Sequence, residues 1–413
     1  MKIFTGGEIM WESKVDIYNV FELRCKTTCY FGVGAINKVG DIFDTLKNQG
    51  IDNVIFVTDK VAYKVTGAWD VIKPELEKRG IKYVIYEDVS PNPTTTQINE
   101  ATKLALENGA KAVIGIGGGS PIDAAKSVAV LLEYTDKTAE ELYEGKFVPT
   151  KAKPIIAINT THGTGTEVDR FAVASILEKE YKPAIAYDCI YPTFAIDDPQ
   201  LMKTLPKNQT IFTAIDAINH VTEAATTLAA SPYSILLAKE TIRLISRYLP
   251  QAVAHPDDLT ARYYLLYASA IAGISFDNGL LHFTHALEHP LSAVKPDLAH
   301  GLGLAILLPA VVKQIYVAKP EVLADIYNPI VPGLKGIPGE AEKIAVGIEK
   351  WLFSLGVTEK LENLGFVEKD IPKLTKLALE TPSLGLLLSM APIKADEKAI
   401  SSIYRDSLTY ISR

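Results

Sequence analysis

The chain has 413 residues, of which 48% are hydrophobic, and this length favours two domains over one. The formal net charge of −7 argues against a nucleic-acid-binding or anionic-membrane surface, and no apolar run reaches the roughly 18 residues of a spanning helix. The amino terminus lacks the apolar core of a signal peptide and three cysteines cannot make a disulfide framework, so we expect a cytoplasmic protein with reduced thiols.

Short apolar strands alternate with helices in the first part of the chain. After a weakly structured lead-in over residues 1–20, the expected strands are 28–31, 53–59, 82–87, 111–117 and 154–160. The expected helices are 35–48, 61–79 with an interruption near Gly67, 96–108 and 121–132. This alternation predicts a parallel sheet covered on both faces, in a Rossmann-like α/β domain over residues 1–203.

Long helical runs replace the strands after about residue 200. The expected helices are 209–228, 231–252, 259–275, 304–318, 341–355 and 370–381, and no strand is expected among them. The second domain is therefore predicted to be all-helical, over residues 204–413, with the boundary near 201–207.

A glycine-rich turn after the fourth strand is the main cofactor signal. It reads GGGSPIDAAK over residues 117–126, and glycines let a phosphate approach the backbone. Ser120 is expected to cap the next helix with Pro121 in its first turn, and the exposed amides there suit a pyrophosphate. Ser120 stands where a G-x-G-x-x-G motif has its third glycine, so a tight turn with Asp123 as a helix-cap carboxylate is the alternative.

Two further features follow strands of the first domain. The loop 160–170 reads TTHGTGTEVDR, and its hydroxyls and bare amides can bind phosphate, ribose or a carboxamide. His162 in this loop could carry protons, although we favour a polar loop residue. Asp59 ends its strand where an open α/β sheet binds ligands, so it either accepts hydrogen bonds from a ribose or caps the following helix.

Residues 281–301 hold four of the seven histidines, His282, His285, His289 and His300. If the start of this stretch is helical, its first three histidines lie at i, i+3 and i+7 on one face, and Pro290 ends or bends the helix. Spacing alone leaves these three as equal candidates for metal ligands.

The helix expected over 209–228 supplies a second pair of candidate ligands. Asp216 and His220 lie at i and i+4, so both reach a common point. Together with His285 and His300 they form a set of one carboxylate and three imidazoles, which suits Fe²⁺, Zn²⁺, Mn²⁺ or Co²⁺. Glu223 and Glu288 flank the histidines; we favour surface charges over hydrogen-bond acceptors behind the ligands.

The sequence resembles the iron-containing (group III) alcohol dehydrogenases from about Cys29 to the C-terminal helices. The motifs that carry the resemblance are VTDK at 57–60, PNPT at 91–94, GGGSPIDAAK at 117–126, TTHGTGTEV at 160–168, DAINHVTEA at 216–224, HALEHPL at 285–291 and AHGLGLAILLP at 299–309.

This resemblance implies the architecture shared with dehydroquinate synthase: a dinucleotide-binding α/β domain, a helical metal-binding domain and a cleft between them. It implies a homodimer or larger homo-oligomer that transfers hydride between a primary or small alcohol and NAD, with NADP less favoured. The implied ligands of Fe²⁺, or of Zn²⁺ or another divalent ion, are Asp216, His220, His285 and His300. His289 is implied to relay protons, and Asp123 to lie beside nicotinamide and substrate. The implied cofactor contacts are Asp59, which favours NAD over NADP, Gly117, Gly118, Gly119, Ser120, Asp123, Thr160, Thr161 and Lys182.

The chain departs from the family pattern at three positions. His162 replaces a small residue, which implies an extra imidazole near the phosphate or nicotinamide. His282 lies outside the common metal motif and is expected to pack behind it. Phe171 stands where some small-diol-specific members carry a polar residue, which implies a more apolar pocket.

Two other classes of function remain as alternatives at this point. A lyase of the dehydroquinate synthase type would need a basic pocket for a phosphorylated acid, and around the metal helices the sequence offers only Lys295. The other alternative is a non-catalytic, metal-stabilised NAD-binding protein.

Overall fold

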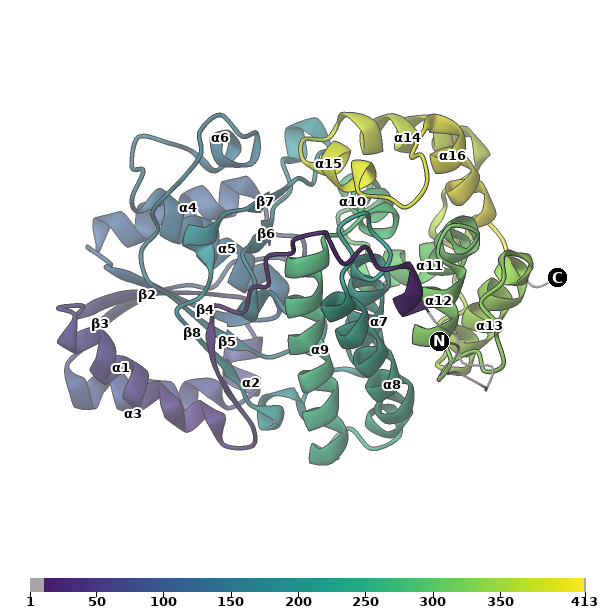
Figure 1. The fold of residues 1–413 in the computed structure, drawn as a ribbon. Helices are drawn as coiled ribbons and strands as arrows, with labels where there is room; N and C mark the ends of the chain where they lie inside the picture. The colour runs from purple at the N-terminus through teal and green to yellow at the C-terminus, as the bar shows by residue number, and fades with distance from the viewer. Residues whose placement is uncertain (1–10, 412–413) are drawn as a thin grey trace.

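The computed structural model describes residues 11–411, in one half built on a sheet and one half built of helices (Figure 1). The sheet has six parallel strands in the order β1-β8-β5-β4-β2-β3. Their bounds are β1 (Thr28–Phe31), β2 (Asn53–Thr58), β3 (Lys82–Tyr86), β4 (Ala112–Gly117), β5 (Ile155–Asn159) and β8 (Phe194–Asp197). The five expected strands are confirmed.

Strand β8 was not expected, although it lies inside the sheet between β1 and β5. It has only four residues, and the residues around it read as turns. Its backbone pairs with β1 on one side and with β5 on the other, and these hydrogen bonds stabilise a strand that the local sequence pattern does not predict.

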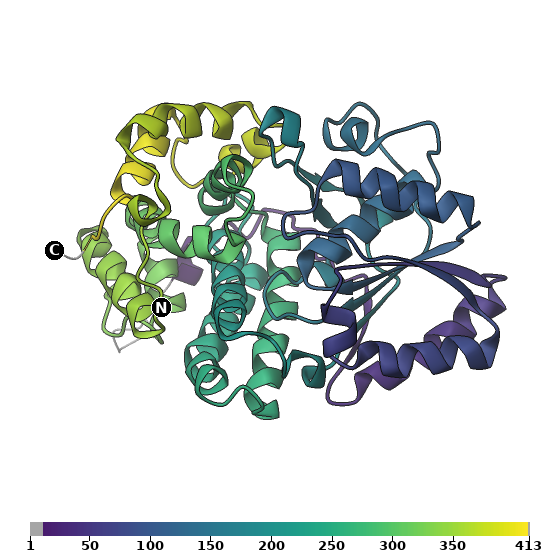
Figure 2. The same cartoon turned by 180° about the vertical axis from the view of Figure 1, so that it is seen from behind.

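Helices cover both faces of the sheet, as predicted (Figures 1 and 2). One face packs on α1 (Val39–Asn48), α2 (Ala62–Val65) and α3 (Ala68–Arg79), and the other on α4 (Thr95–Glu107), α5 (Gly119–Leu131) and α6 (Ala139–Tyr143). Strand β2 is apolar along its length because its side chains enter the cores on both faces of the sheet. Val54 and Phe56 join the first of these cores, and Ile55 and Val57 join the second.

Between β5 and β8 the chain forms a two-stranded antiparallel ribbon, β6 (Phe171–Val173) and β7 (Ala184–Ala186), which the sequence did not predict. The backbone N–H of Ala184 donates a 2.9 Å hydrogen bond to Ser383 Oγ, far along the helical half. The ribbon therefore bridges the two halves.

Residues 207–411 form no strand, in agreement with the prediction. Their helices are α7 (Lys207–Ala224), α8 (Pro232–Ala254), α9 (Leu259–Gly279), α10 (Phe283–Val294), α11 (His300–Tyr316), α12 (Pro320–Ile326), α13 (Ala341–Ser354), α14 (Ile371–Glu380), α15 (Leu384–Ser389) and α16 (Glu397–Asp406). They share one continuous apolar core. The helices of the described part do not combine the length and hydropathy needed to cross a bilayer.

The described part of the lead-in crosses onto the helical half (Figure 1). Trp11 Nε1 donates a 3.1 Å hydrogen bond to Asp325, and the backbone of Arg24 exchanges two hydrogen bonds with the Asn278 side chain, at 2.6 and 2.9 Å. The first ten residues of the expected lead-in lie outside the described residues.

Several helix boundaries differ from the expected ones: α7 ends at Ala224 rather than at residue 228, and α9 ends at Gly279 rather than at residue 275. Pro290 lies inside α10, which continues to Val294, so of the two expected effects, an end or a bend, the end is excluded. An internal proline costs about 3 kcal/mol, but nearly every side chain of this helix is buried and the packing outweighs that cost. Helix α11 begins at His300 rather than at residue 304, and α5 begins at Gly119, so Ser120 is not its cap.

Candidate active site

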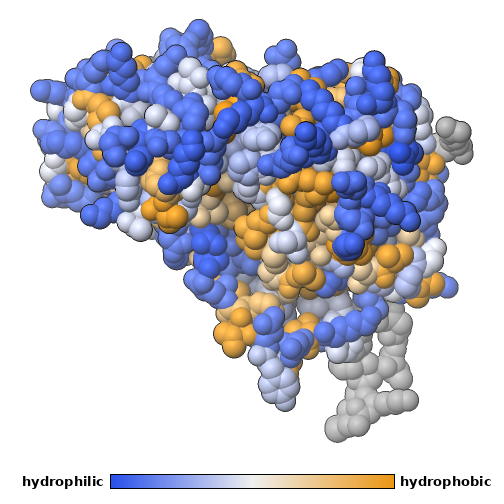
Figure 3. All heavy atoms as spheres, turned by 90° about the horizontal axis from the view of Figure 1, so that it is seen from above, coloured by the Kyte–Doolittle hydropathy of each residue, from blue (hydrophilic) through white to orange (hydrophobic). Residues whose placement is uncertain are grey.

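A cavity of about 660 Å³ lies between the two halves. Its walls come from the carboxyl ends of β2, β4 and β5 on one side, and from α7, α9, α10 and the start of α11 on the other. Parallel sheets bind ligands at this edge of their strands. From above, Figure 3 shows apolar side chains gathered around the hollow between the two lobes.

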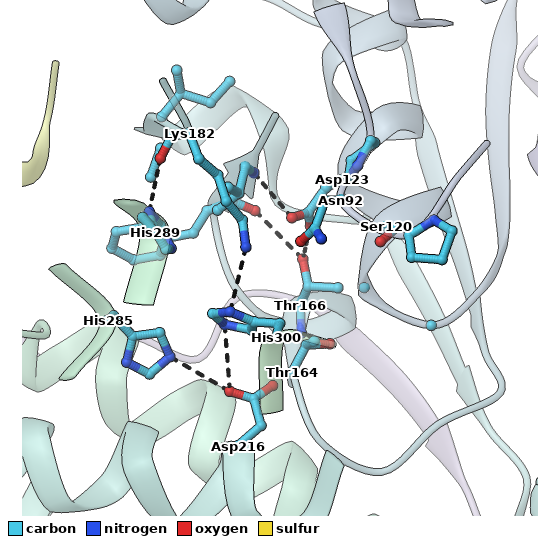
Figure 4. Close-up of a pocket in the computed structure, with 18 of the residues that line it drawn as sticks. Asn92, Ser120, Asp123, Thr164, Thr166, Lys182, Asp216, His285, His289 and His300 are labelled. Atoms are coloured by element: carbon cyan, nitrogen blue, oxygen red, sulfur yellow. Dashed lines mark hydrogen bonds and ion pairs between the residues drawn. The ribbon is translucent and has the colours of Figure 1, made fainter. Parts of the chain in front are cut away.

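The four predicted ligands converge at one end of this cavity, and Figure 4 labels three of them, Asp216, His285 and His300. Asp216 Oδ1 lies 3.5 Å from His220 Nε2, 3.5 Å from His285 Nε2 and 3.9 Å from His300 Nε2. Ligand atoms held about 2.1 Å from one tetrahedral ion are about 3.4 Å apart, so the separations fit a divalent metal. Asp216 Oδ1 and His285 Nε2 are buried without a hydrogen-bond partner among residues 11–411, as expected of atoms reserved for an ion.

The surrounding charges keep the Asp216 carboxylate ionised. Burial opposes its charge, but His220, His285 and His300 lower the pKa of Asp216 well below 3.8. The ligand set therefore presents an anionic oxygen together with imidazole nitrogens.

Glu223 and Glu288 are fully buried, so their expected role as surface charges is wrong. The Glu223 carboxylate contacts His285 Nδ1 and accepts the backbone N–H groups of His282 and Thr284, both at 2.9 Å. Glu288 contacts His300 Nδ1 in the same way. Each contact places the imidazole proton on Nδ1 and leaves Nε2 free for a metal.

Helical spacing already indicated that both carboxylates lie near candidate metal ligands. Glu223 follows Asp216 by seven residues on α7, and Glu288 follows His285 by three on α10, so each shares a face with a ligand. Burial of that face was the missing information.

Glu223→Gln should weaken metal binding by about 10- to 100-fold and lower the melting temperature. The amide oxygen can still accept the backbone N–H groups that Glu223 Oε1 accepts, but its NH₂ group then faces the His285 Nδ1–H, which it cannot accept. Metal titration and thermal unfolding measure the two effects. Glu380→Gln, an exposed carboxylate in the same half, is the matched control. Unchanged metal affinity in Glu223→Gln would show that this carboxylate does not support the ligand.

His289 also lines the cavity but is not among the four converging ligands (Figure 4). Its Nδ1 lies 2.8 Å from the Lys182 carbonyl oxygen, so Nδ1 carries the proton and Nε2 has a free lone pair. Burial and then the Lys182 ammonium lower the pKa of His289 well below 6.5. The imidazole is therefore neutral at neutral pH and can accept a proton.

Asp123 and Lys182 face the same space from the sheet-based half (Figure 4). Asp123 accepts hydrogen bonds from Thr166 Oγ1 at 2.7 Å and from the backbone N–H of Val173 at 2.9 Å, and burial raises its pKa to about 6. Lys182 Nζ lies 3.3 Å from Glu288 and 3.4 Å from His300 Nδ1. Lys182 therefore lies beside a candidate metal ligand as well as on the cavity wall.

Most of the candidate cofactor residues line the cavity. Those on its surface are Asp59, Gly118, Gly119, Ser120, Asp123, Thr161 and Lys182. Gly117 and Thr160 lie just behind the lining, joined by a 2.9 Å backbone hydrogen bond. Gly117 has a φ of 146°, and a Cβ there would lie 2.6 Å from Pro121 Cγ, so this turn requires glycine.

Asp59 holds the chain before α2 and also lines the cavity. Its Oδ1 accepts the backbone N–H groups of Val61 at 2.8 Å and Ala62 at 2.7 Å, so it caps the start of α2. It also lines the cavity, where a carboxylate can meet a ribose.

The two remaining histidines of the motifs do not line the cavity. His282 precedes α10 rather than lying on its face: its Nδ1 accepts the Phe283 N–H at 2.6 Å and its Nε2 contacts Thr226 Oγ1 at 2.8 Å. Its expected packing role is confirmed. His162 is fully buried behind the cavity, 3.0 Å from Arg262, so the expected imidazole on the phosphate or nicotinamide site is absent from the lining.

Several residues of the site were not predicted from the sequence. Phe276 stacks on His220 with ring centroids 4.5 Å apart, and Thr166 holds the Asp123 carboxylate. Asn92, from the PNPT motif, donates to the carbonyls of Pro296 at 3.0 Å and Leu298 at 3.3 Å across the cleft. In the sequence, only the PNPT motif pointed to Asn92 as a residue of the site. The helical pattern around Phe276 did not distinguish it from an ordinary core residue.

Known proteins match the chain over both halves. Residues 26–199 match the iron-containing alcohol dehydrogenase family, and residues 210–408 match the C-terminal part of the Fe-containing alcohol dehydrogenase family. A long-chain primary alcohol dehydrogenase of Thermoanaerobacter ethanolicus is 68% identical, covering 96% of this chain and 100% of its own. A 1,3-propanediol dehydrogenase of Klebsiella pneumoniae is 33% identical, covering 94% of this chain and 99% of its own.

Solved structures show the same architecture. The NADH-dependent butanol dehydrogenase A of Thermotoga maritima superposes with a TM-score of 0.85 at 30% identity, covering 95% of this chain and 99% of its own. The two-domain fold, the converging ligand residues and the sequence matches all indicate the same family. The chain belongs to the iron-containing alcohol dehydrogenase family.

Proposed function

We propose that this alcohol dehydrogenase interconverts long-chain primary alcohols and their aldehydes, with Fe²⁺ as its metal and NAD as its preferred cofactor. The carrying observation is the position of the four converging ligands, at one end of a cavity whose other walls are apolar side chains and a glycine-rich turn. The 68% identical relative, a long-chain primary alcohol dehydrogenase, supports the substrate class.

Asp216, His220, His285 and His300 would hold the ion. A divalent ion at this site supplies Lewis acidity toward the oxygen of an alcohol or aldehyde. Three imidazoles and one carboxylate suit Fe²⁺ without excluding Zn²⁺ or another divalent ion, and family membership favours iron.

The other residues of the site bind the reactants and move the proton. The amides around Gly118 and Gly119, at the start of α5, suit the pyrophosphate, and Asp123 and Lys182 lie nearer the metal end (Figure 4). His289 Nε2 accepts the proton in alcohol oxidation and returns it in aldehyde reduction.

Apolar side chains support the long-chain assignment. Phe171 and Phe276 pack with ring centroids 5.2 Å apart on the cavity wall, so Phe171 has the apolar role expected of it. The remaining apolar wall includes Val173, Ile185, Leu281, Leu298, Leu386 and Leu387. Such a surface stabilises an alkyl tail and excludes water.

A panel of ethanol, butanol, octanol and decanol with NAD⁺ tests the proposal. We expect kcat/KM to rise along the series, because each buried methylene contributes about 0.8 kcal/mol, roughly fourfold. A value that peaks at ethanol and falls with every longer alcohol would overturn the long-chain assignment. Activity after reconstitution with Fe²⁺, compared with Zn²⁺, tests the metal.

Replacing Asp59 with glycine should relax the preference for NAD⁺ over NADP⁺ by about tenfold or more. The carboxylate lines the cavity and repels a 2′-phosphate, and glycine removes that charge. The ratio of kcat/KM values for the two cofactors is the measurement. Asp257→Asn, an exposed aspartate remote from the cavity, controls for the loss of one charge. A wild-type enzyme at least as efficient with NADP⁺ would contradict the assignment.

The two alternative functions gain no support. Lys182 is the only lysine or arginine among the residues that line the cavity, and it is paired with Glu288, whereas a phosphorylated acid needs a basic pocket. The membership of both halves in a family of dehydrogenases removes the case for a non-catalytic protein.

We further infer a cytoplasmic homo-oligomer. The three cysteines are free thiols, which suits a reducing compartment. The N-terminal segment crossing the helical half exposes Ile17, Tyr18 and Val20 by 80% or more, and such apolar side chains favour burial against another copy. Light scattering in solution gives the oligomeric state.

A further inference from the structure

Arg262, in the first turn of α9, is fully buried and has no carboxylate within salt-bridge distance among the described residues. Its Nε donates to the Pro256 carbonyl at 2.9 Å, and its Nη1 donates to Thr210 Oγ1 at 2.8 Å and lies 3.0 Å from His162 Nε2. Its Nη2 has no partner among residues 11–411. Burial lowers the pKa of Arg262 to about 10, so it remains charged at neutral pH. A buried charge is tolerated only when it is hydrogen-bonded, so each acceptor matters.

This contact fixes the tautomer of His162. A guanidinium only donates, so His162 Nε2 accepts and Nδ1 carries the proton, 3.3 Å from Thr213 Oγ1. The Thr213 hydroxyl in turn donates to the Gln209 carbonyl at 2.8 Å. Burial and then the Arg262 charge lower the pKa of His162 to about 3, so the imidazole stays neutral. A hydrogen-bonded chain thus runs from α9 through the loop to α7, and both Thr213 and Gln209 line the cavity.

The loop that carries His162 packs directly on the glycine-rich turn. A Cβ on Gly118 would lie 2.9 Å from Thr161 Cγ2, and a Cβ on Gly119 would lie 2.6 Å from Thr164 Cγ2. A displaced loop would therefore move Thr161 and Thr164 against the turn proposed to bind the pyrophosphate.

At its other end, this series of hydrogen bonds reaches α7, the helix that carries the candidate ligands Asp216 and His220. Thr213 precedes Asp216 by three residues on α7, and a Cβ on Gly163 would lie 2.6 Å from Thr213 Cβ. Figure 4 shows Thr164 and Thr166 between Asp216 and the turn that carries Ser120. His162 thus connects the nucleotide-binding turn to the helix that supplies two metal ligands.

We propose that His162 is a positioning residue that, held by Arg262, fixes the loop 160–166 and the adjoining glycines relative to α7 and so sets cofactor affinity. The inference rests on the proposed function, because it takes the glycine-rich turn as the pyrophosphate site. The proposal gives a structural role to His162, which stands where related sequences usually have a small residue in this loop.

His162→Ala, compared with His162→Gln, tests the proposal. The alanine variant should raise the KM for NAD⁺ and the Kd for NADH by about tenfold, while metal content and the KM for the alcohol change little. The glutamine variant should restore most of the affinity, because its amide oxygen can accept from Arg262 and its NH₂ can donate to Thr213. His255→Ala, which removes an exposed imidazole at the end of α8, is the matched control. All assays are run well below the melting temperatures of the variants.

Arg262→Met provides an independent arm in case the alanine variant does not fold. It removes the buried charge, so it should fold and still show weaker NAD⁺ binding, and the pair with His162→Ala should be non-additive. Wild-type KM and Kd in folded His162→Ala, with only a lower melting temperature, would overturn the proposal. Without folded His162→Ala, wild-type NADH affinity in Arg262→Met would do the same. Fluorescence titration with NADH needs no turnover, so a wild-type enzyme inactive on alcohols would refute the proposed function and leave this test intact.

Discussion

Asp216→Ala should remove the bound metal and alcohol oxidation together, with kcat/KM reduced to about one thousandth or less. Its Oδ1 faces all three imidazole Nε2 atoms and carries the only negative charge among the four ligands. Without it the imidazoles have a weaker hold on a divalent cation, and loss of several kcal/mol of Lewis-acid stabilisation corresponds to about three powers of ten in rate. Elemental analysis and steady-state kinetics of the same preparation measure both effects.

The matched control for Asp216→Ala is Asp257→Ala, at an exposed aspartate of the same half. It should retain full metal content and activity. Full metal occupancy in Asp216→Ala would contradict the assignment of this ligand. Loss of activity with retained metal would instead assign Asp216 to substrate binding.

His289→Ala should keep its metal but lower kcat for alcohol oxidation by roughly 100- to 10,000-fold, the range for loss of a general base. The imidazole lines the cavity beside the ligand cluster, with its Nδ1 proton held by the Lys182 carbonyl and its Nε2 free. Metal analysis and a pH–rate profile check the result, with His255→Ala as the control for removing a histidine.

The pH dependence of His289→Ala has a definite sign. Burial and Lys182 lower the pKa of His289 well below 6.5, so the wild-type base is neutral and active throughout the neutral and alkaline range. It is lost only when pH falls through that lowered pKa. In the variant the proton passes to water or hydroxide, whose supply rises with pH, so the deficit should be largest at low pH. Loss of metal in His289→Ala would show that this histidine is a ligand instead.

The residues proposed as metal ligands could be predicted because their residue types and spacing are local features of the sequence. The i, i+4 pair Asp216 and His220, and the unusual density of histidines over 281–301, mark ligands by residue type and spacing alone. Spacing could not rank His282, His285 and His289. The resemblance separated them. In the structure His285 lies with Asp216 and His220, His289 lies beside Glu288 and His300, and His282 precedes the helix.

The two halves and most of the sheet could be predicted from local pattern, since buried parallel strands and amphipathic helices each have a characteristic hydrophobic period. Which polar residues are buried could not be predicted in this way, because it depends on contacts between distant segments. Strand β8 exists because two neighbours pair with it, Glu223 and Glu288 lie under the metal ligands, and His162 meets Arg262 one hundred residues away. Burial and hydrogen-bond partnership depend on distant segments meeting in space, and no local pattern encodes that.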